Sequence, residues 1–189
     1  DKYIDFYHTP SLKTLEQLRK LTNKKIFHIP YWINNKNYFY IEDKQRLRKK
    51  YGFKSNDYLI GSFQRDTEGY DLKSPKLIKG PDIFINKVIN LFANNQEIVV
   101  VLTGKRRQYI IDELKSNNIP YKYFEMVQPN EINELYNILN LYIVSSRIEG
   151  GPQAILECAI TKTPIISTDV GLASEVLHET SIYINEISN

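Results

Sequence analysis

After about residue 57, two kinds of hydrophobic pattern follow one another in turn along the chain. Short continuous apolar runs, rich in β-branched residues, predict buried strands, and apolar residues recurring at helical spacing predict helices. The expected strands cover 58–63, 97–103, 121–126, 141–146, 164–169 and 181–185. The expected helices cover 81–92, 107–118, 130–139, 152–160 and 171–178. Asn130 is the expected N-cap of the third of these helices, and Pro152 is expected in the first turn of the fourth.

Strands that alternate with helices indicate right-handed βαβ crossovers and a parallel sheet covered on both faces. The predicted fold class is therefore α/β, with a doubly wound, Rossmann-like sheet. Ligands of such folds bind beyond the carboxyl ends of the strands. The loops after Phe63, Thr103, Met126, Ser146 and Asp169 are the expected functional edge.

The first 56 residues have a less regular pattern. It predicts a helix over 11–21 capped by Ser11, a short strand from residue 25 to Pro30, and a charged helix over 42–52 closed by Gly52. We assign residues 1–56 to an interdomain junction with leading helices and residues 57–189 to the doubly wound domain.

Composition narrows the class without identifying it. Hydrophobic residues make up 42% and charged residues 25% of the chain, as in ordinary soluble proteins. The net charge of +3 favours anions only weakly. The single cysteine, Cys158, excludes an internal disulfide and is expected in the core, and the N-terminus has no signal-peptide pattern. These features predict a cytoplasmic protein.

The segment EGGPQAILE, residues 149–157, connects an expected strand to an expected helix. Gly150 and Gly151 allow close approach of a ligand to the backbone, and a helix N-terminus binds anions. Glu149 and Glu157 can each accept hydrogen bonds from hydroxyl groups. The alternative is that Glu149 is a solvated loop charge and Glu157 an exposed residue on a half-buried helix.

Two further segments bring cations to the same edge. GSFQRD places Arg65 after the first strand of the domain, and KLIKGPDIF places Lys79 before a helix. This pair suits a diphosphate, or is two surface charges. The cluster Lys105, Arg106 and Arg107 at a later helix start is either near an anion or on a solvated face.

Several common motifs are absent. The sequence has neither the G-x-G-x-x-G dinucleotide fingerprint, nor a P-loop, nor a G-x-S-x-G nucleophile elbow. Its three histidines lack metal-ligand spacing, and no stripe of basic and aromatic residues indicates nucleic-acid binding.

EGGPQAILE resembles the E-x7-E motif of the retaining GT-B glycosyltransferases, known as glycosyltransferase family 4 or group 1. LIGSFQRD, KLIKGPDIF and the segment from NEINELY to SEVL are similar to the family's second domain, and KIFHIPYWIN to its interdomain junction. The similarity covers roughly residues 26–185. The resemblance implies that residues 57–189 are the nucleotide-sugar-binding, C-terminal half of a GT-B fold.

The resemblance also implies roles for individual residues. Arg65 and Lys79 would hold the diphosphate, Glu157 the ribose hydroxyls, and Glu149 would contact the transferred sugar as the catalytic residue. The segment Gly150, Gly151, Pro152 and Gln153 would line the phosphates and the sugar, and Val127 would border the base pocket. The donor would be a UDP- or GDP-sugar, with no cofactor and no metal required.

The sequence departs from the family pattern in three ways. The chain begins near the junction, so we expect the acceptor-binding N-terminal domain to be missing and this fragment alone to be inactive. Tyr31 and Trp32 stand where the family usually has asparagine and glycine, and Leu172 where it often has a second glycine.

The acceptor would be a glycan or a lipid-linked glycan, with membrane contact left open. The alternatives are a GT-B-fold sugar-nucleotide epimerase and a non-catalytic nucleotide-sugar-binding module.

Overall fold

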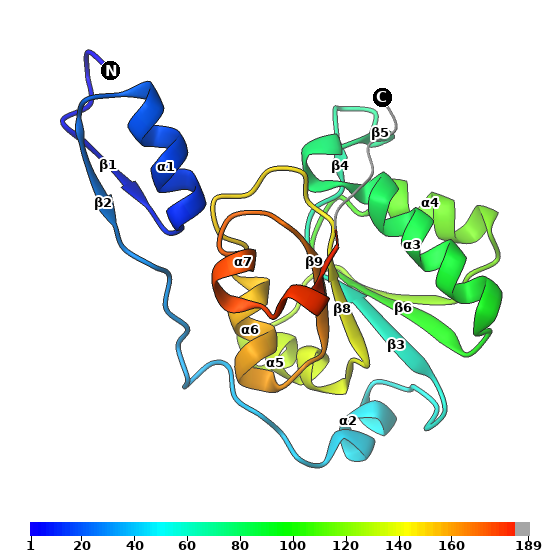
Figure 1. The fold of residues 1–189 in the computed structure, drawn as a ribbon. Coiled ribbons are helices and arrows are strands. Elements are labelled where there is room, and N and C mark those ends of the chain that lie inside the picture. Colours follow the sequence, from blue (N-terminus) through cyan, green and yellow to red (C-terminus); the bar gives the residue numbers. More distant parts are fainter. Residues whose placement is uncertain (184–189) are drawn as a thin grey trace.

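The computed structural model describes residues 1–183, and its centre is a six-stranded parallel sheet (Figure 1). The strands lie in the order β10-β9-β8-β3-β6-β7. Their bounds are Tyr58–Ser62 (β3), Ile98–Thr103 (β6), Tyr121–Phe124 (β7), Leu141–Val144 (β8), Ile165–Thr168 (β9) and Ile182–Tyr183 (β10). Counted along the chain this is the strand order 3-2-1-4-5-6 of Rossmann folds, so the predicted fold class is confirmed.

Helices cover both faces of this sheet because alternate strand residues point to opposite sides. The helices are Lys44–Lys50 (α2), Pro81–Asn94 (α3), Gln108–Ser116 (α4), Pro129–Ile138 (α5), Ala154–Thr161 (α6) and Ala173–Val176 (α7), with one-turn 3-10 helices at Leu77–Lys79 and Glu179–Ser181. Leu59 and Val101 face the core under α5 and α6, and Ile60 and Val100 face the core under α3 and α4. None of the helices in residues 1–183 combines the length and apolar character needed to cross a bilayer.

The leading segment forms a second, smaller unit beside the main sheet (Figure 1). Two parallel strands, β1 (Phe6–Thr9) and β2 (Lys25–His28), are joined by the helix α1 (Leu12–Leu21). Ser11 caps α1 as predicted, since its side chain accepts from the Thr14 amide. The strand over Phe6–Thr9 was not expected, because only Phe6 and Tyr7 in it are apolar enough to mark a strand.

Several predicted boundaries move by a few residues. The helix α5 begins at Pro129 with Gln128 as its cap, so the prediction of Asn130 was wrong; Gln128 and Glu131 form a reciprocal capping box instead. The helix α6 begins at Ala154, so Pro152 precedes it and does not lie in its first turn. The described part of the last strand is Ile182–Tyr183, and residues 184–185 lie outside the described residues.

A short antiparallel pair, β4 (Thr67–Glu68) and β5 (Ser74–Pro75), fills the loop between Arg65 and Lys79. The helix α2 packs on α5, and the side chain of Arg48 donates to the carbonyl of Ile138. The division of the chain at residue 57 into a junction and a domain stays a prediction.

Candidate functional site

The order of the strands reverses between β3 and β8, which are neighbours in the sheet. The loops that leave their carboxyl ends run in opposite directions, and a crevice at this point is the usual ligand site of the fold. The loop after β3 carries Gln64 and Arg65, and the loop after β8 carries Glu149. Two predicted site segments, 81 residues apart at Gln64 and Ser145, therefore meet.

Lys79 and Glu149 form an ion pair in this crevice, and both side chains are mostly buried. The same Glu149 oxygen accepts from Ser146 Oγ at 3.1 Å. Ser146 Oγ lies 3.2 Å from Gln64 Oε1, and Gln64 Nε2 donates to the carbonyl of Lys79 at 2.9 Å. The predicted diphosphate lysine and the predicted sugar carboxylate thus belong to one cluster, together with two residues that sequence reasoning missed.

Gly80 explains how Lys79 reaches this position. Its φ is +59°, and a Cβ built on it would lie 1.8 Å from the carbonyl oxygen of Ser145. Only glycine permits this close crossing of two backbones. The Arg147 amide also donates to the carbonyl of Ile78 at 2.9 Å, so the β8–α6 loop is fixed against the segment that carries Lys79.

Arg147 and Asp82 reinforce that crossing from outside the crevice. The guanidinium donates to both carboxylate oxygens, at 2.8 and 2.6 Å, and to the carbonyl of Leu77. The hydrogen bonds from Arg147 lower the pKa of Asp82 below its ordinary value. This pair connects the first turn of α3 to the loop that precedes Glu149.

Arg65 lies exposed on the loop after β3, next to Gln64. Its side chain makes no hydrogen bond and no ion pair with the other residues in 1–183. Its cation is therefore free to meet an anion at the mouth of the crevice. Whether it contacts a diphosphate stays a prediction.

Glu157 lies in the first turn of α6 and is half buried among tyrosines. The hydroxyl of Tyr136 donates to its Oε2 at 2.5 Å. Burial, together with the nearby Glu157 charge, raises the pKa of Tyr38 above its ordinary value, and the pKa of the fully buried Tyr136 is raised mainly by burial. The interpretation of Glu157 as a plain exposed residue was wrong, because its carboxylate is half buried beside Tyr136 and Tyr38.

The segment between the two carboxylates presents free backbone donors. The N–H groups of Gly150, Gly151 and Gln153 donate no hydrogen bond within residues 1–183. Pro152 has no N–H, so it shapes the turn without binding an anion through its backbone. Gly150 has open space where a Cβ would stand. The role of these residues toward a phosphate or sugar stays a prediction.

Val127 follows β7 and is half buried against the core beneath α5 and α6. Its strand is at the far edge of the sheet, two strands from the β3–β8 crevice. The base pocket at Val127 stays a prediction. Cys158, in contrast, is fully buried in the same core, as expected, and burial raises the pKa of its thiol.

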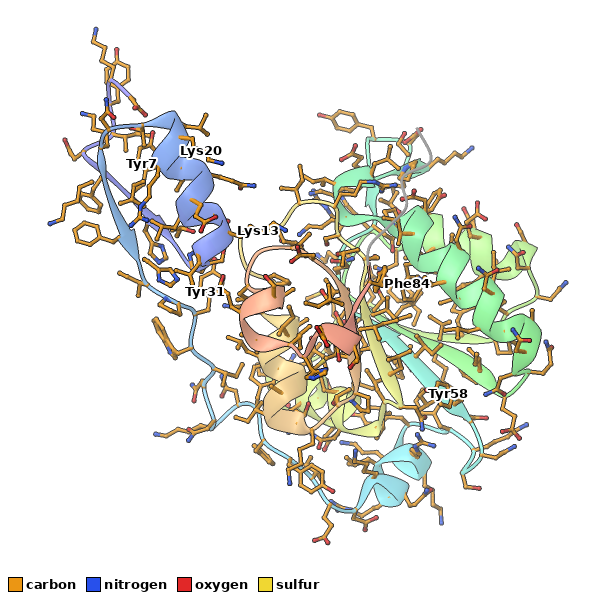
Figure 2. All side chains as sticks on the ribbon, viewed as in Figure 1. Tyr7, Lys13, Lys20, Tyr31, Tyr58 and Phe84 are labelled. Atoms are coloured by element: carbon orange, nitrogen blue, oxygen red, sulfur yellow. The ribbon has the colours of Figure 1, made fainter. Side chains whose placement is uncertain are left out.

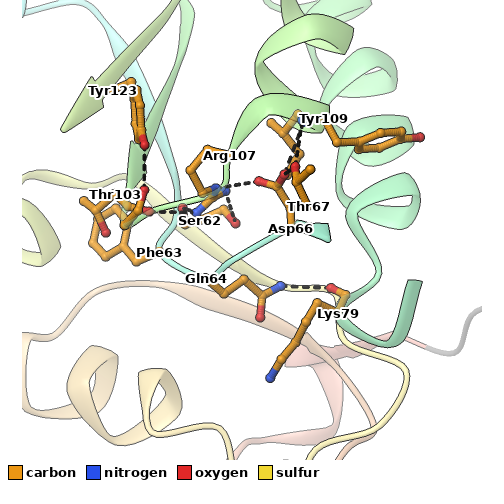
Figure 3. A network of polar contacts seen from close by, with 12 residues as sticks. Ser62, Phe63, Gln64, Asp66, Thr67, Lys79, Thr103, Arg107, Tyr109 and Tyr123 are labelled. Carbon is orange, nitrogen blue, oxygen red and sulfur yellow. Dashed lines mark hydrogen bonds and ion pairs between the residues drawn. The ribbon is translucent and has the colours of Figure 1, made fainter. Parts of the chain in front are cut away.

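A buried ion pair supports the loop after β3 (Figure 3). Arg107 is completely buried and donates to Asp66 Oδ2 at 2.5 Å and to the carbonyl of Ser62 at 2.6 Å. Asp66 in turn accepts from Thr67 Oγ1 at 2.7 Å. The solvated face is therefore wrong for Arg107, and the anion near it is the carboxylate of Asp66, a residue 41 positions earlier in the chain.

The leading unit reaches the same edge of the sheet. Lys13 on α1 donates to the carbonyl and the carboxylate of Asp169, at 2.7 and 2.8 Å, and the Leu12 amide donates to Glu175 Oε1 at 2.7 Å. A cavity of about 120 Å³ lies between α1 and these loops. Its lining residues are Lys13, Thr14, Gln17, Arg147, Ile148, Glu149, Asp169, Val170 and Gly171.

A family model described as "Glycosyl transferases group 1" matches residues 73–187, which is more than half of the chain. The chain belongs to the group 1 glycosyl transferases. The resemblance noted in the sequence is thereby confirmed at the level of the family. The retaining mechanism stays a prediction.

Known relatives extend the comparison of this group 1 glycosyl transferase. The lipopolysaccharide core biosynthesis mannosyltransferase LpcC of Rhizobium leguminosarum bv. viciae is 26% identical over 106 residues, covering 52% of this chain and 30% of LpcC. Anabaena Alr3699/HepE, solved in complex with UDP-glucose, has a TM-score of 0.77 at 15% identity, over 98% of this chain and 51% of HepE. Sucrose-phosphate synthase (tll1590) from Thermosynechococcus elongatus has a TM-score of 0.75 at 16% identity, over 98% and 46%. The chain thus spans about half the length of these two solved structures and less of LpcC, and it shares their GT-B half-fold.

Proposed function

We propose that this chain binds the nucleotide-diphospho-sugar donor of a retaining hexosyltransferase that builds a polysaccharide or glycoconjugate. The cluster of Lys79, Glu149, Ser146 and Gln64 at the β3–β8 crevice carries the proposal. Such a cluster places one cation and one carboxylate at the point where the fold binds ligands. It also agrees with the names of the relatives LpcC and HepE, which describe a mannosyltransferase and a complex with UDP-glucose.

The donor would be held along the segment from Glu149 to Glu157. Lys79 and Arg65 bind the diphosphate, and the free N–H groups of Gly150 and Gly151 add donors to it. Glu157, whose carboxylate is held by Tyr136, accepts hydrogen bonds from the ribose hydroxyls. Val127 borders the base, and Gln153 lines the sugar.

Binding would change the partner of Lys79. The ammonium is now paired with Glu149, and a diphosphate carries more negative charge than one carboxylate. The donor therefore competes for Lys79 and frees Glu149 to accept hydrogen bonds from the sugar hydroxyls near the reacting carbon. Glu149 is in this way the proposed catalytic residue, since it touches the transferred sugar.

Transfer with retention requires attack on the face from which the diphosphate leaves. The bond between the anomeric carbon and the diphosphate oxygen breaks, the acceptor oxygen bonds to that carbon, and the acceptor proton passes to the departing diphosphate. Lys79 and Arg65 neutralise the charge that develops on the leaving group, so we expect no metal requirement. The acceptor is a glycan or lipid-linked glycan, and the proposed location is the cytoplasm, with contact at the inner membrane face where the acceptor is lipid-linked.

A sugar-nucleotide epimerase and a non-catalytic binding module remain the alternatives. The epimerases of this fold lack the E-x7-E layout, which is present here at Glu149 and Glu157. The intact pair of Lys79 and Glu149 in the crevice argues against a decayed, non-catalytic site.

The test is calorimetric titration of the chain with UDP-glucose and GDP-mannose, with and without EDTA. Lys79→Ala should weaken binding about 10- to 100-fold, since a charge-assisted hydrogen bond contributes about 1.5–3 kcal/mol. Glu157→Gln should weaken nucleoside diphosphate binding by about tenfold. Lys115→Ala is the matched control, because Lys115 is exposed in the last turn of α4. Absence of saturable binding, or equal losses in Lys79→Ala and Lys115→Ala, contradicts the proposal.

A further inference from the structure

A second cavity, of about 450 Å³, lies beside the donor segment on the side of the leading unit. Its lining residues are His8, Ile29, Pro30, Tyr31, Trp32 and Gln153. This volume is within the range of small-molecule sites. Neither Lys79 nor Glu149 lines the cavity, so it is separate from the ion-pair cluster.

The cavity is continuous with the donor segment through Tyr31 and Gln153. A Cβ built on Gly151 would lie 3.2 Å from Tyr31 Cε2 and 3.1 Å from Pro10 Cγ. The Tyr31 ring therefore rests directly on the glycine loop that follows Glu149. Gln153, two residues further along, also lines the cavity. Figure 2 shows Tyr31 at the end of β2 nearest the main domain.

The aromatic side chains of this cavity are exposed to water, which is unfavourable for their apolar surface. Trp32 is 81% exposed and Tyr31 is 37% exposed, and both follow the end of β2. Exposed aromatic side chains that line a cavity mark binding sites more often than isolated apolar residues do. Tryptophan supplies a large flat contact at a small cost in conformational entropy.

The lining selects the class of ligand. It carries no carboxylate, lysine or arginine, so it offers nothing specific to a phosphate. The Gln153 amide can both donate and accept, and His8 Nε2 is bonded to the carbonyl of Ile29 at 2.9 Å, which leaves its Nδ1 as an acceptor. A flat apolar face with a rim of polar groups matches a pyranose ring, whose C–H bonds lie against the negative face of an indole while its hydroxyls bond at the edge.

We propose that Trp32, Tyr31 and Gln153 form a subsite for a pyranose ring of the acceptor saccharide. The proposal rests on the proposed function, which supplies the donor on the other side of the same loop. Gln153, which also lines the donor sugar, is shared by the two sites. The acceptor is favoured for this cavity because Glu149 and Lys79, assigned to the transferred sugar and the diphosphate, are both absent from its lining. The subsite thus places an acceptor ring next to the glycine loop of the donor segment.

Trp32 allows a direct test, since it is the only tryptophan in the chain. The chain is titrated with methyl α-D-glucopyranoside, methyl α-D-mannopyranoside and methyl β-D-galactopyranoside while tryptophan emission is recorded. We expect a saturable change with at least one glycoside in the millimolar range, unchanged within twofold in Lys79→Ala. Gln153→Ala should weaken that glycoside about fivefold or more, with the same melting temperature as the parent chain.

Titration with UDP-glucose distinguishes an acceptor ring in this cavity from the donor's own sugar ring. An emission change that requires UDP-glucose and is absent with every free glycoside overturns the acceptor assignment in favour of the donor sugar. No saturable change with any glycoside, in a chain that still binds UDP-glucose by calorimetry, overturns the subsite and leaves the proposed function standing. Glycoside binding without any nucleotide-sugar binding supports the subsite and contradicts the proposed function. Trp32→Ala should leave the calorimetric Kd of UDP-glucose within twofold.

Discussion

At the scale of single residues, Gly80 and Gly104 have the same unusual backbone with different surroundings. Both have a positive φ, of 59° and 84°. A Cβ on Gly80 would collide with the Ser145 carbonyl, whereas a Cβ on Gly104 would meet no atom within 4 Å. The two positions therefore separate the effect of backbone strain from the effect of a steric collision.

Gly80→Ala should lower the free energy of unfolding by about 3 kcal/mol or more, and Gly104→Ala by about 1 kcal/mol. The first change must push the Lys79 segment away from β8, while the second adds strain only. Urea denaturation of both variants measures the difference. Equal losses for the two substitutions would show that the crossing at Ser145 is not as tight as the distances indicate.

At the scale of elements, the Asp82–Arg147 pair joins the start of α3 to the loop after β8. Its hydrogen bonds lower the pKa of Asp82 in the folded state. A depressed carboxyl pKa contributes stability that is present above the unfolded value of about 3.9 and is lost as the pH falls through the folded pKa. The contribution is modest, about 0.5–1 kcal/mol, because both side chains are about one third exposed.

Asp82→Asn should therefore reduce the free energy of unfolding by about 0.5–1 kcal/mol at pH 7. The difference from the parent chain should stay constant down to about pH 5 and disappear as the pH falls through the folded pKa of Asp82, which lies below the unfolded value of about 3.9. Denaturant unfolding across this pH range measures it. Asp112→Asn on α4 is the control, because Asp112 is exposed and has no ion pair among the described residues. A difference that grows on acidification would contradict the assigned role of the pair.

At the scale of the whole molecule, α1 is held to the main domain by few contacts. Lys13 pairs with Asp169, and Glu175 accepts from the Leu12 amide (Figure 2 shows Lys13 facing the main domain). These side chains are well exposed, so each contact contributes little. The leading unit should therefore open more readily than the central sheet.

The double change Lys13→Met with Glu175→Gln should speed hydrogen exchange of α1 and β2 amides about fivefold, which corresponds to about 1 kcal/mol. Amides of β6 should keep the exchange rates of the parent chain. Lys20→Met serves as control, since Lys20 lies in the last turn of the same helix. Comparable acceleration in Lys20→Met would assign the effect to α1 alone and not to its contact with β9 and α7.

Periodicity along the chain was enough to predict the Rossmann-like sheet, because buried parallel strands and the helices between them have distinct local patterns. The boundaries of α5 and α6 were missed by one or two residues, since several polar residues there are chemically able to cap a helix. The strand at Phe6–Thr9 was missed because half of it is polar. The hydrophobic pattern does not predict a strand whose extended conformation depends on pairing with a neighbouring strand.

The sequence alone was enough to identify the spacing of Glu149 and Glu157 and the glycines between them, because one loop and one helix turn carry all of these residues. It was not enough to predict which charged side chains pair. Lys79 meets Glu149 across 70 residues, and Arg107 meets Asp66 across 41, so their neighbours in sequence carry no trace of either contact. Whether a charge is solvated, paired or buried depends on the low-dielectric space around it, which exists only once distant segments have packed together. The sequence by itself determines the helices, the strands and the donor segment, whereas the packing of β3 against β8 determines which of the many charged side chains face a ligand.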